Sequence, residues 1–336
     1  MKKVLYKLTI IITILLFITG CNSSKYNGEV NILNWSSYIP YEIISDFEKE
    51  YNIKVNYGTY SSNEELLAKV SSSKEGMYDL IFPSDYMIEL MISKNMLEKI
   101  DKSKIKNYEN INPLFLFQSF DEKNEYSLPF LAATSVIAVN RNNIKDNITS
   151  YNDLMNLKYK NDIVLIDDQR IIIGMALQAN KFNMNETDEQ KLDLAKKWLL
   201  NLNKNIKAFD SDSPKTFLIT NEVDIGVIWN AEAIIAKDYN PNIEIIYPKD
   251  GFAISLDNYA IVKGSKNSDN AYKFIDYILR DEVNKKITDE YPYINTTINN
   301  INLEEEELLN VLKNASYVKN IGSNISKYDK IWAQIK

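Results

Sequence analysis

Apolar and polar positions follow two patterns that take turns along the chain from Val30 onward. Short apolar runs with strand character lie at 30–33, 53–60 and 78–83. Stretches with apolar residues at helical spacing lie at 41–51, 64–73 and 88–96. Strands that alternate with helices in this way are typical of an α/β fold with mainly parallel sheets. The first third of the chain is therefore predicted to form one α/β unit.

A second set of alternating segments follows the first, and two strand-like runs at 135–140 and 255–262 connect the sets. Its predicted strands lie at 162–166, 206–209, 224–229 and 243–247, and its predicted helices at 172–180 and 189–202. Further helices are expected at 271–279, 282–288, 303–312 and 328–335. We expect lobe 1 to comprise 30–133 plus 256–300 and lobe 2 to comprise 134–255 plus 301–336. Two lobes joined by crossing strands leave a ligand cleft between them.

The start of the chain has the pattern of a lipoprotein signal peptide, residues 1–20. Lysines precede an apolar run at 8–18 that is too short to span a bilayer comfortably, and Gly20 is a small residue directly before Cys21. We expect a thioether-linked lipid on Cys21 and a tether at 21–29 that holds the protein on the outer face of a membrane. An ordinary signal peptide or a short membrane anchor is the alternative.

Composition removes several classes of function. The chain of 336 residues has a formal net charge of −7, one cysteine and no histidine, and loss of residues 1–20 with their three lysines leaves −10. Nucleic acid is not an expected partner, because phosphates require clustered lysine and arginine. Histidine-dependent catalysis and zinc sites are excluded, and the scattered glycines form no phosphate loop. We expect no catalysis, cofactor or metal, although a glycoside hydrolase acting through paired carboxylates stays open.

Aromatic residues stand beside small polar residues at several predicted strand ends. These segments are 34–38, 83–86, 229–232 and 291–293. Each one alone is better explained by core packing or a helix cap than by a site. Their recurrence in both lobes favours a shared site, because loops after strands carry ligand contacts in α/β proteins. Trp198 and Trp332 lie among apolar residues on predicted helices and are assigned to packing.

Carboxylates accompany these aromatic residues. Asp167 and Asp168 follow an apolar strand, Glu232 follows Trp229, and Asp257 lies on a predicted crossing strand. Acids beside aromatic faces, with no histidine and little arginine nearby, suit an organic ammonium ion held by cation–π contacts and charge-assisted hydrogen bonds. Capping of the next helix is the alternative role for Asp167 and Asp168.

Five segments resemble, in order and spacing, the signatures of the spermidine/putrescine-binding proteins of polyamine ABC transporters. They are 34–38, 78–84, 208–212, 228–230 and 247–251. The resemblance implies a type II periplasmic-binding-protein fold, in which two α/β lobes close on a ligand about a hinge. It also implies a polyamine ligand and an ABC permease in the membrane as partners, and we expect a monomer.

The resemblance also implies which residues contact the ligand, and it places Asp257 on the cleft floor. The matched positions are Trp35, Ser36, Tyr38, Ser84, Tyr86, Asp168, Ser211, Trp229, Asp257 and Tyr291. Glu232 joins this set because putrescine binders often carry an acid three residues after the tryptophan of the Trp229 motif.

The chain departs from the spermidine-binding pattern, which usually has two acids, a tryptophan and a glutamine at four of its positions. These positions are Ser37, Ile171, Ser255 and, for the glutamine, the neighbourhood of Val318. The departures favour putrescine over spermidine. We expect a lipid-anchored, extracytoplasmic polyamine-binding protein that delivers its ligand to a permease. A polyamine-sensing lipoprotein that signals through a membrane receptor is the alternative.

Overall fold

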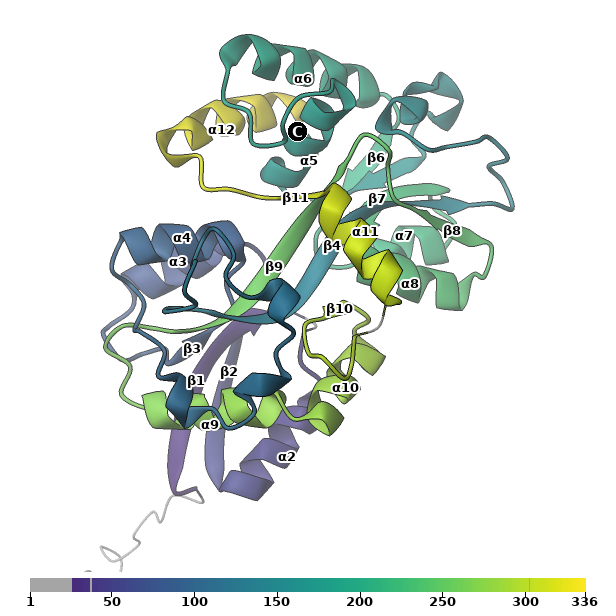
Figure 1. Cartoon of the computed structure of the whole chain (residues 1–336). Helices are drawn as coiled ribbons and strands as arrows, with labels where there is room; N and C mark the ends of the chain where they lie inside the picture. The colour runs from purple at the N-terminus through teal and green to yellow at the C-terminus, as the bar shows by residue number, and fades with distance from the viewer. Residues whose placement is uncertain (1–25, 37, 302) are drawn as a thin grey trace, which may run out of the picture.

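The computed structural model describes residues 26–36, 38–301 and 303–336. The predicted signal peptide, Cys21 and Ser37 lie outside these described residues. The described elements form two groups on either side of a pair of long strands (Figure 1). No helix in this part of the chain is long and apolar enough to cross a membrane.

Lobe 1 is built on a parallel arrangement in which β1 lies between β2 and β3. Its strands are β1 (Gly28–Trp35), β2 (Ile53–Tyr60) and β3 (Leu80–Ile81). Its helices are α2 (Tyr41–Tyr51), α3 (Asn63–Ser72), α4 (Asp85–Ser93), α9 (Ser268–Ile278) and α10 (Asp281–Glu290). Short 3-10 turns follow α4 at Lys102–Lys104, Tyr108–Asn110 and Pro113–Phe115. Val30, Phe47 and Phe274 are fully buried in the core between β1, α2 and α9.

Lobe 2 repeats this plan with β5 between β6 and β7, again in parallel. Its strands are β5 (Ile163–Leu165), β6 (Ile206–Phe209), β7 (Ile225–Trp229) and β8 (Ile243–Ile246). Its helices are α5 (Gln169–Ala179), α6 (Glu189–Leu202), α7 (Lys215–Ile219), α8 (Asn230–Tyr239) and α12 (Ile325–Ile335), with 3-10 turns at Tyr151–Met155, Leu157–Tyr159 and Gly322–Asn324. The C-terminal α12 packs on α5 and α6.

Two long strands cross between the lobes, as predicted. β4 (Leu128–Asn140) and β9 (Phe252–Ile261) form an antiparallel pair. β9 also pairs with β3 of lobe 1, and β4 also pairs with β7 and β8 of lobe 2. Short strands β10 (Ile294–Asn295) and β11 (Ala315–Tyr317) pair with β4 and β9, and α11 (Glu305–Asn314) lies beside them (Figure 1). The α/β architecture is thus confirmed.

The expectation of mainly parallel sheets is wrong for the crossing strands. The chain leaves lobe 1 along β4 and returns along β9, so these strands must run in opposite directions. The strand predicted at 78–83 is also shorter, because only Leu80 and Ile81 pair with neighbours. The lobe boundaries given above stay a prediction.

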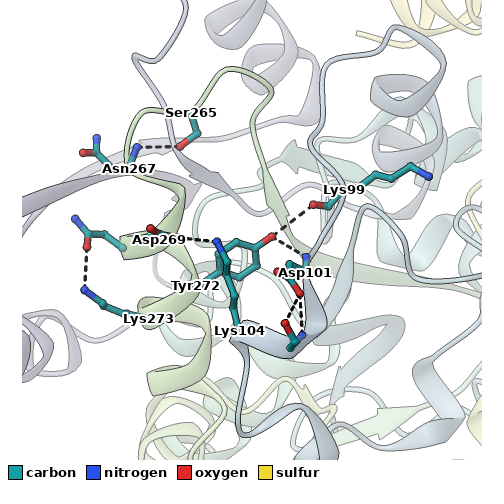
Figure 2. Close-up of polar contacts among 10 residues, drawn as sticks. Lys99, Asp101, Lys104, Ser265, Asn267, Asp269, Tyr272 and Lys273 are labelled. Carbon is teal, nitrogen blue, oxygen red and sulfur yellow. Dashed lines mark hydrogen bonds and ion pairs between the residues drawn. The ribbon is translucent and has the colours of Figure 1, made fainter.

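Figure 2 shows how α9 is attached to the segment that follows α4. The Tyr272 hydroxyl accepts the N–H of Asp101 at 2.8 Å. Lys104 Nζ lies 2.7 Å from Asp269 Oδ1, and Asp101 Oδ1 accepts the N–H of Ser103 at 3.1 Å. Exposed ion pairs contribute little to stability. The bond to Tyr272, whose side chain is buried, therefore contributes more than the exposed ion pair. The N–H of Asn107 adds a further attachment by donating to Asp276 Oδ1 of α9 at 2.8 Å.

We expect Tyr272→Phe to lower the free energy of unfolding by about 1 kcal/mol, because the partly buried N–H of Asp101 loses its acceptor. Urea unfolding of the mature protein measures this change. Tyr41→Phe is the matched control, since Tyr41 is 80% exposed and the same oxygen is removed there. Equal effects of the two substitutions would show that the Tyr272 hydroxyl does not stabilise the fold.

Candidate ligand-binding cleft

A cavity of about 230 Å³ lies between the lobes, where strands from both of them end. Trp35 closes β1, Ser84 precedes α4, and Asp168 precedes α5. Trp229 closes β7, and Asp257 comes from β9 between the lobes. Because the carboxyl ends of parallel strands meet at one edge of a sheet, each lobe presents its loops to the same space.

The structure brings the predicted site residues together, with one exception. Tyr291 does not line the cavity; it is half-buried against the lobe 1 core, and Tyr293 lines the cavity instead. The predicted residues that line the cavity are Trp35, Ser36, Tyr38, Ser84, Tyr86, Asp168, Ser211, Trp229, Glu232 and Asp257. Their contact with a ligand stays a prediction.

Asp257 is the most enclosed acid of the cavity, with 3% of its surface exposed. Tyr38 donates its hydroxyl to Asp257 Oδ2 and Ser84 donates to Oδ1, both at 2.6 Å. Asn63 in turn donates to the Ser84 hydroxyl at 3.1 Å. Burial raises the pKa of Asp257 to about 6. Both of these donors are neutral, so the carboxylate is oriented without a positive charge from them.

Asp168 caps the helix that follows it, which was the alternative role considered for this acid. Its Oδ1 accepts the N–H groups of Arg170 at 2.7 Å and Ile171 at 3.1 Å. Burial and the nearby Glu64 carboxylate raise the pKa of Asp168 to about 6. The capping role does not remove Asp168 from the cavity, which it also lines. Asp167 does not cap the helix in this way; it forms an ion pair with Lys336, 2.6 Å from Nζ.

Glu232 lies in the first turn of α8 and is 8% exposed. Both of its carboxylate oxygens accept hydrogen bonds from Lys215 Nζ, at 2.8 and 2.9 Å. Burial nevertheless raises the pKa of this carboxyl above its ordinary value. Glu232 thus differs from Asp257, because the chain itself supplies its cation.

Flat aromatic rings line the cavity beside these acids. Tyr38 and Tyr293 have ring centroids 4.6 Å apart, and Trp35 lies 4.6 Å from Tyr60. Trp35 is held by a 2.9 Å hydrogen bond from its indole N–H to the carbonyl of Phe82. Aromatic faces beside carboxylates bind the methylene groups and the charged ends of an organic cation.

Sequence reasoning missed several residues of the cavity. Arg170 lies there with 2% exposure, although little arginine was expected near the site, and its Nη2 donates to Asn185 at 2.9 Å. Trp332, assigned only to packing, lines the cavity and contacts Phe209 edge to face at 5.2 Å. Glu64 follows the end of β2, so the strand-end rule that located the other loops would have included it.

Residues 42–306 match the family described as bacterial extracellular solute-binding protein. A spermidine/putrescine-binding periplasmic protein of Escherichia coli K12 is 33% identical over 320 residues, or 92% of each chain. The spermidine/putrescine ABC transporter substrate-binding protein of Streptococcus pneumoniae is 32% identical with a TM-score of 0.79, over 92% of this chain and 98% of its own. A Treponema pallidum lipoprotein is 26% identical with a TM-score of 0.84, over 92% and 99%. These matches confirm the predicted type II periplasmic-binding-protein fold.

We expect the stability of the ligand-free protein to fall as the pH rises from 5 to 7. Asp168 and Asp257 ionise with a pKa of about 6 in the fold against an ordinary value of 3.8, so the folded state binds more protons in this range. Asp85 and Glu232, whose pKa values burial also raises, act in the same direction. Thermal melts across this pH range measure the effect.

The variant Asp257→Asn separates this effect from the general charge of an acidic chain. It removes one titrating carboxyl, so its melting temperature should depend less on pH than that of the unmodified protein. The chain has no histidine to titrate in the same range. Acids with a lowered pKa, such as Glu186 at about 2, lose their contribution only at lower pH. A melting temperature that rises from pH 5 to 7 would contradict the assignment.

Proposed function

The chain belongs to the bacterial extracellular solute-binding proteins, and from this premise we propose that it is the polyamine-binding component of an ABC importer. It binds its ligand outside the cytoplasm and releases it to a permease. The relatives named as spermidine/putrescine-binding proteins support this ligand class, since they match most of the chain at 33% and 32% identity.

The observation that carries the proposal is the environment of Asp257. The carboxylate of Asp257 is 3% exposed, and hydrogen bonds from the Tyr38 and Ser84 hydroxyls fix its orientation. Both donors are neutral, so they bring no positive charge to it. An unpaired buried charge is costly, and a ligand ammonium removes that cost when it arrives. The rings of Trp35 and Tyr293 border the same cavity and provide faces for the ligand's methylene groups.

Lobe closure follows from the position of the cavity. Asp257 comes from a crossing strand, Ser84 from lobe 1, and Asp168 from lobe 2. A ligand that contacts all of them makes its full set of bonds only when the lobes are closed. It therefore shifts an equilibrium between open and closed forms by its difference in affinity for them.

The setting of the protein is part of the same proposal. We propose that Cys21 carries a lipid that anchors the chain to the outer face of a membrane, as the lipoprotein from Treponema pallidum suggests. We also propose that the protein acts as a monomer beside its permease and catalyses no reaction. The carboxylates Asp168 and Glu232 are engaged in a helix cap and an ion pair, which disfavours glycoside hydrolysis. A sensing role finds no support among these relatives.

We expect the mature protein to bind one linear polyamine per chain and to melt at a higher temperature with it, because the ligand binds only the folded state. Calorimetric titration with putrescine, cadaverine, spermidine and spermine measures stoichiometry and affinity. Butylamine is the matched control, since it has the four-carbon chain of putrescine and a single ammonium. Absence of heat and of a thermal shift with every polyamine at millimolar concentration would overturn the proposed function.

Asp257→Asn should weaken polyamine binding about tenfold to a hundredfold, because one charge-assisted hydrogen bond contributes roughly 1.5–3 kcal/mol. The substitution keeps the side-chain volume and removes the charge. Asp238→Asn is the control, because Asp238 is an exposed acid on α8 outside the cavity lining. The dissociation constants of both variants are measured at the same salt concentration. An unchanged constant for Asp257→Asn would place the ligand elsewhere.

A further inference from the structure

We propose that Lys215 is a specificity-determining residue: its ammonium group occupies Glu232 and thereby makes the cleft selective for diamines over longer polyamines. This inference rests on the proposed function and names which polyamine the same site prefers. Lys215 does not itself line the cavity, but Glu232, whose carboxylate it binds, does.

The contact between Lys215 and Glu232 is close and enclosed. The ammonium lies 2.8 and 2.9 Å from the two carboxylate oxygens, so it bridges both of them. The side chains of Lys215 and Glu232 are 21% and 11% exposed, which makes this pair the least exposed of the ion pairs among the described residues. Little water is present to screen the attraction, unlike at surface ion pairs.

Both partners belong to lobe 2, which keeps the pair intact when the lobes move. Lys215 begins α7 and Glu232 lies in the first turn of α8, and these two helices pack against each other. A ligand ammonium must therefore compete with a tethered group of the same chemistry. The effective concentration of a tethered partner is on the order of millimolar or more, so a ligand rarely displaces it.

The acids of the cavity that are neither exposed nor paired with a lysine match a ligand with two ammonium groups. Asp168 and Asp257 line the cavity and form no ion pair with a lysine among the described residues. Asp167, in contrast, is paired with Lys336 through Nζ at 2.6 Å, as Glu232 is paired with Lys215. Glu64 and Asp212 also line the cavity, but both are exposed, so water screens their charges. Arg170 is the one arginine of the lining, and its Nη2 donates to Asn185.

A third ligand ammonium is therefore disfavoured for two reasons. The acid that could accept it, Glu232, is already bonded on both oxygens. The Lys215 ammonium also repels a second positive charge brought to the same carboxylate. Putrescine and cadaverine have two ammonium groups and avoid this cost, whereas spermidine has three charged nitrogens.

The test is calorimetric titration of putrescine and spermidine into the mature protein and into Lys215→Met, at one salt concentration. In Lys215→Met the side chain is shorter by one atom, stays unbranched, and leaves Glu232 without its cation. We expect spermidine to gain affinity relative to putrescine by about tenfold or more, because a charge-assisted hydrogen bond contributes that factor. The unmodified protein should bind putrescine more tightly than spermidine.

Two further variants make the test specific. Lys215→Met combined with Glu232→Gln should return the ratio of affinities toward that of the unmodified protein, because no carboxylate is left to accept the third ammonium. Lys237→Met removes one positive charge from an exposed position of α8 and should leave the ratio unchanged. If Lys215→Met does not fold, Lys215→Gln replaces it, because glutamine keeps hydrogen-bond donors beside Glu232. Spermidine is again expected to gain affinity relative to putrescine.

The outcomes separate the inference from the proposed function. If the unmodified protein binds a polyamine and the folded Lys215 variants keep its ratio of affinities, the assignment of Lys215 is wrong and the proposed function stands. Tighter binding of spermidine than of putrescine by the unmodified protein also overturns the assignment. If the unmodified protein binds no polyamine, the proposed function itself fails.

Discussion

A carboxylate that is buried between two lobes needs a cation or hydrogen-bond donors to stabilise its charge. The source of that stabilisation differs among the acids of this site. Glu232 obtains it from Lys215 within lobe 2. Asp168 obtains partial charge from the backbone N–H groups at the start of α5. Asp257 has two hydroxyl donors in Tyr38 and Ser84, which orient it without supplying a positive charge. Three acids in one cavity thus have three different states before any ligand arrives.

The crossing strands explain why Asp257 occupies its special position. Every residue of β4 is buried, and β9 has only one half-buried position, Ser255. Strands enclosed in this way cannot offer their polar groups to water, so a carboxylate on them needs designated donors. Those donors come from lobe 1 in sequence regions far from residue 257. Asp257 therefore belongs to the crossing strands, while its donors Tyr38 and Ser84 belong to lobe 1.

The strand-end loops could be predicted because the rule that locates them is local. An apolar run followed by aromatic and polar residues marks the end of a strand, and it placed Trp35, Ser84 and Trp229 in one cavity. The choice between Tyr291 and Tyr293 could not be made in this way, since both follow α10 and only the turn of the chain decides which ring faces inward.

The pairing of Lys215 with Glu232 was equally out of reach, because it depends on how α7 and α8 pack rather than on spacing along one helix. Arg170 was missed for a different reason. An arginine two positions after a capping aspartate ordinarily reaches solvent, whereas here α5 is buried along nearly its whole length and takes the guanidinium into the interior. Residue 37, where the spermidine-binding pattern has an acid, lies outside the described part of the chain.

The direction of β1 places the start of the described chain and the cavity at opposite ends of one strand. β1 begins at Gly28 and ends at Trp35 on the cavity, and its eight residues span about 25 Å. Any attachment through the residues before Gly28 is therefore made at the edge of lobe 1 that is remote from the cleft, as Figure 1 lets the reader follow. β1 therefore separates the start of the described chain from the cavity by the length of one strand.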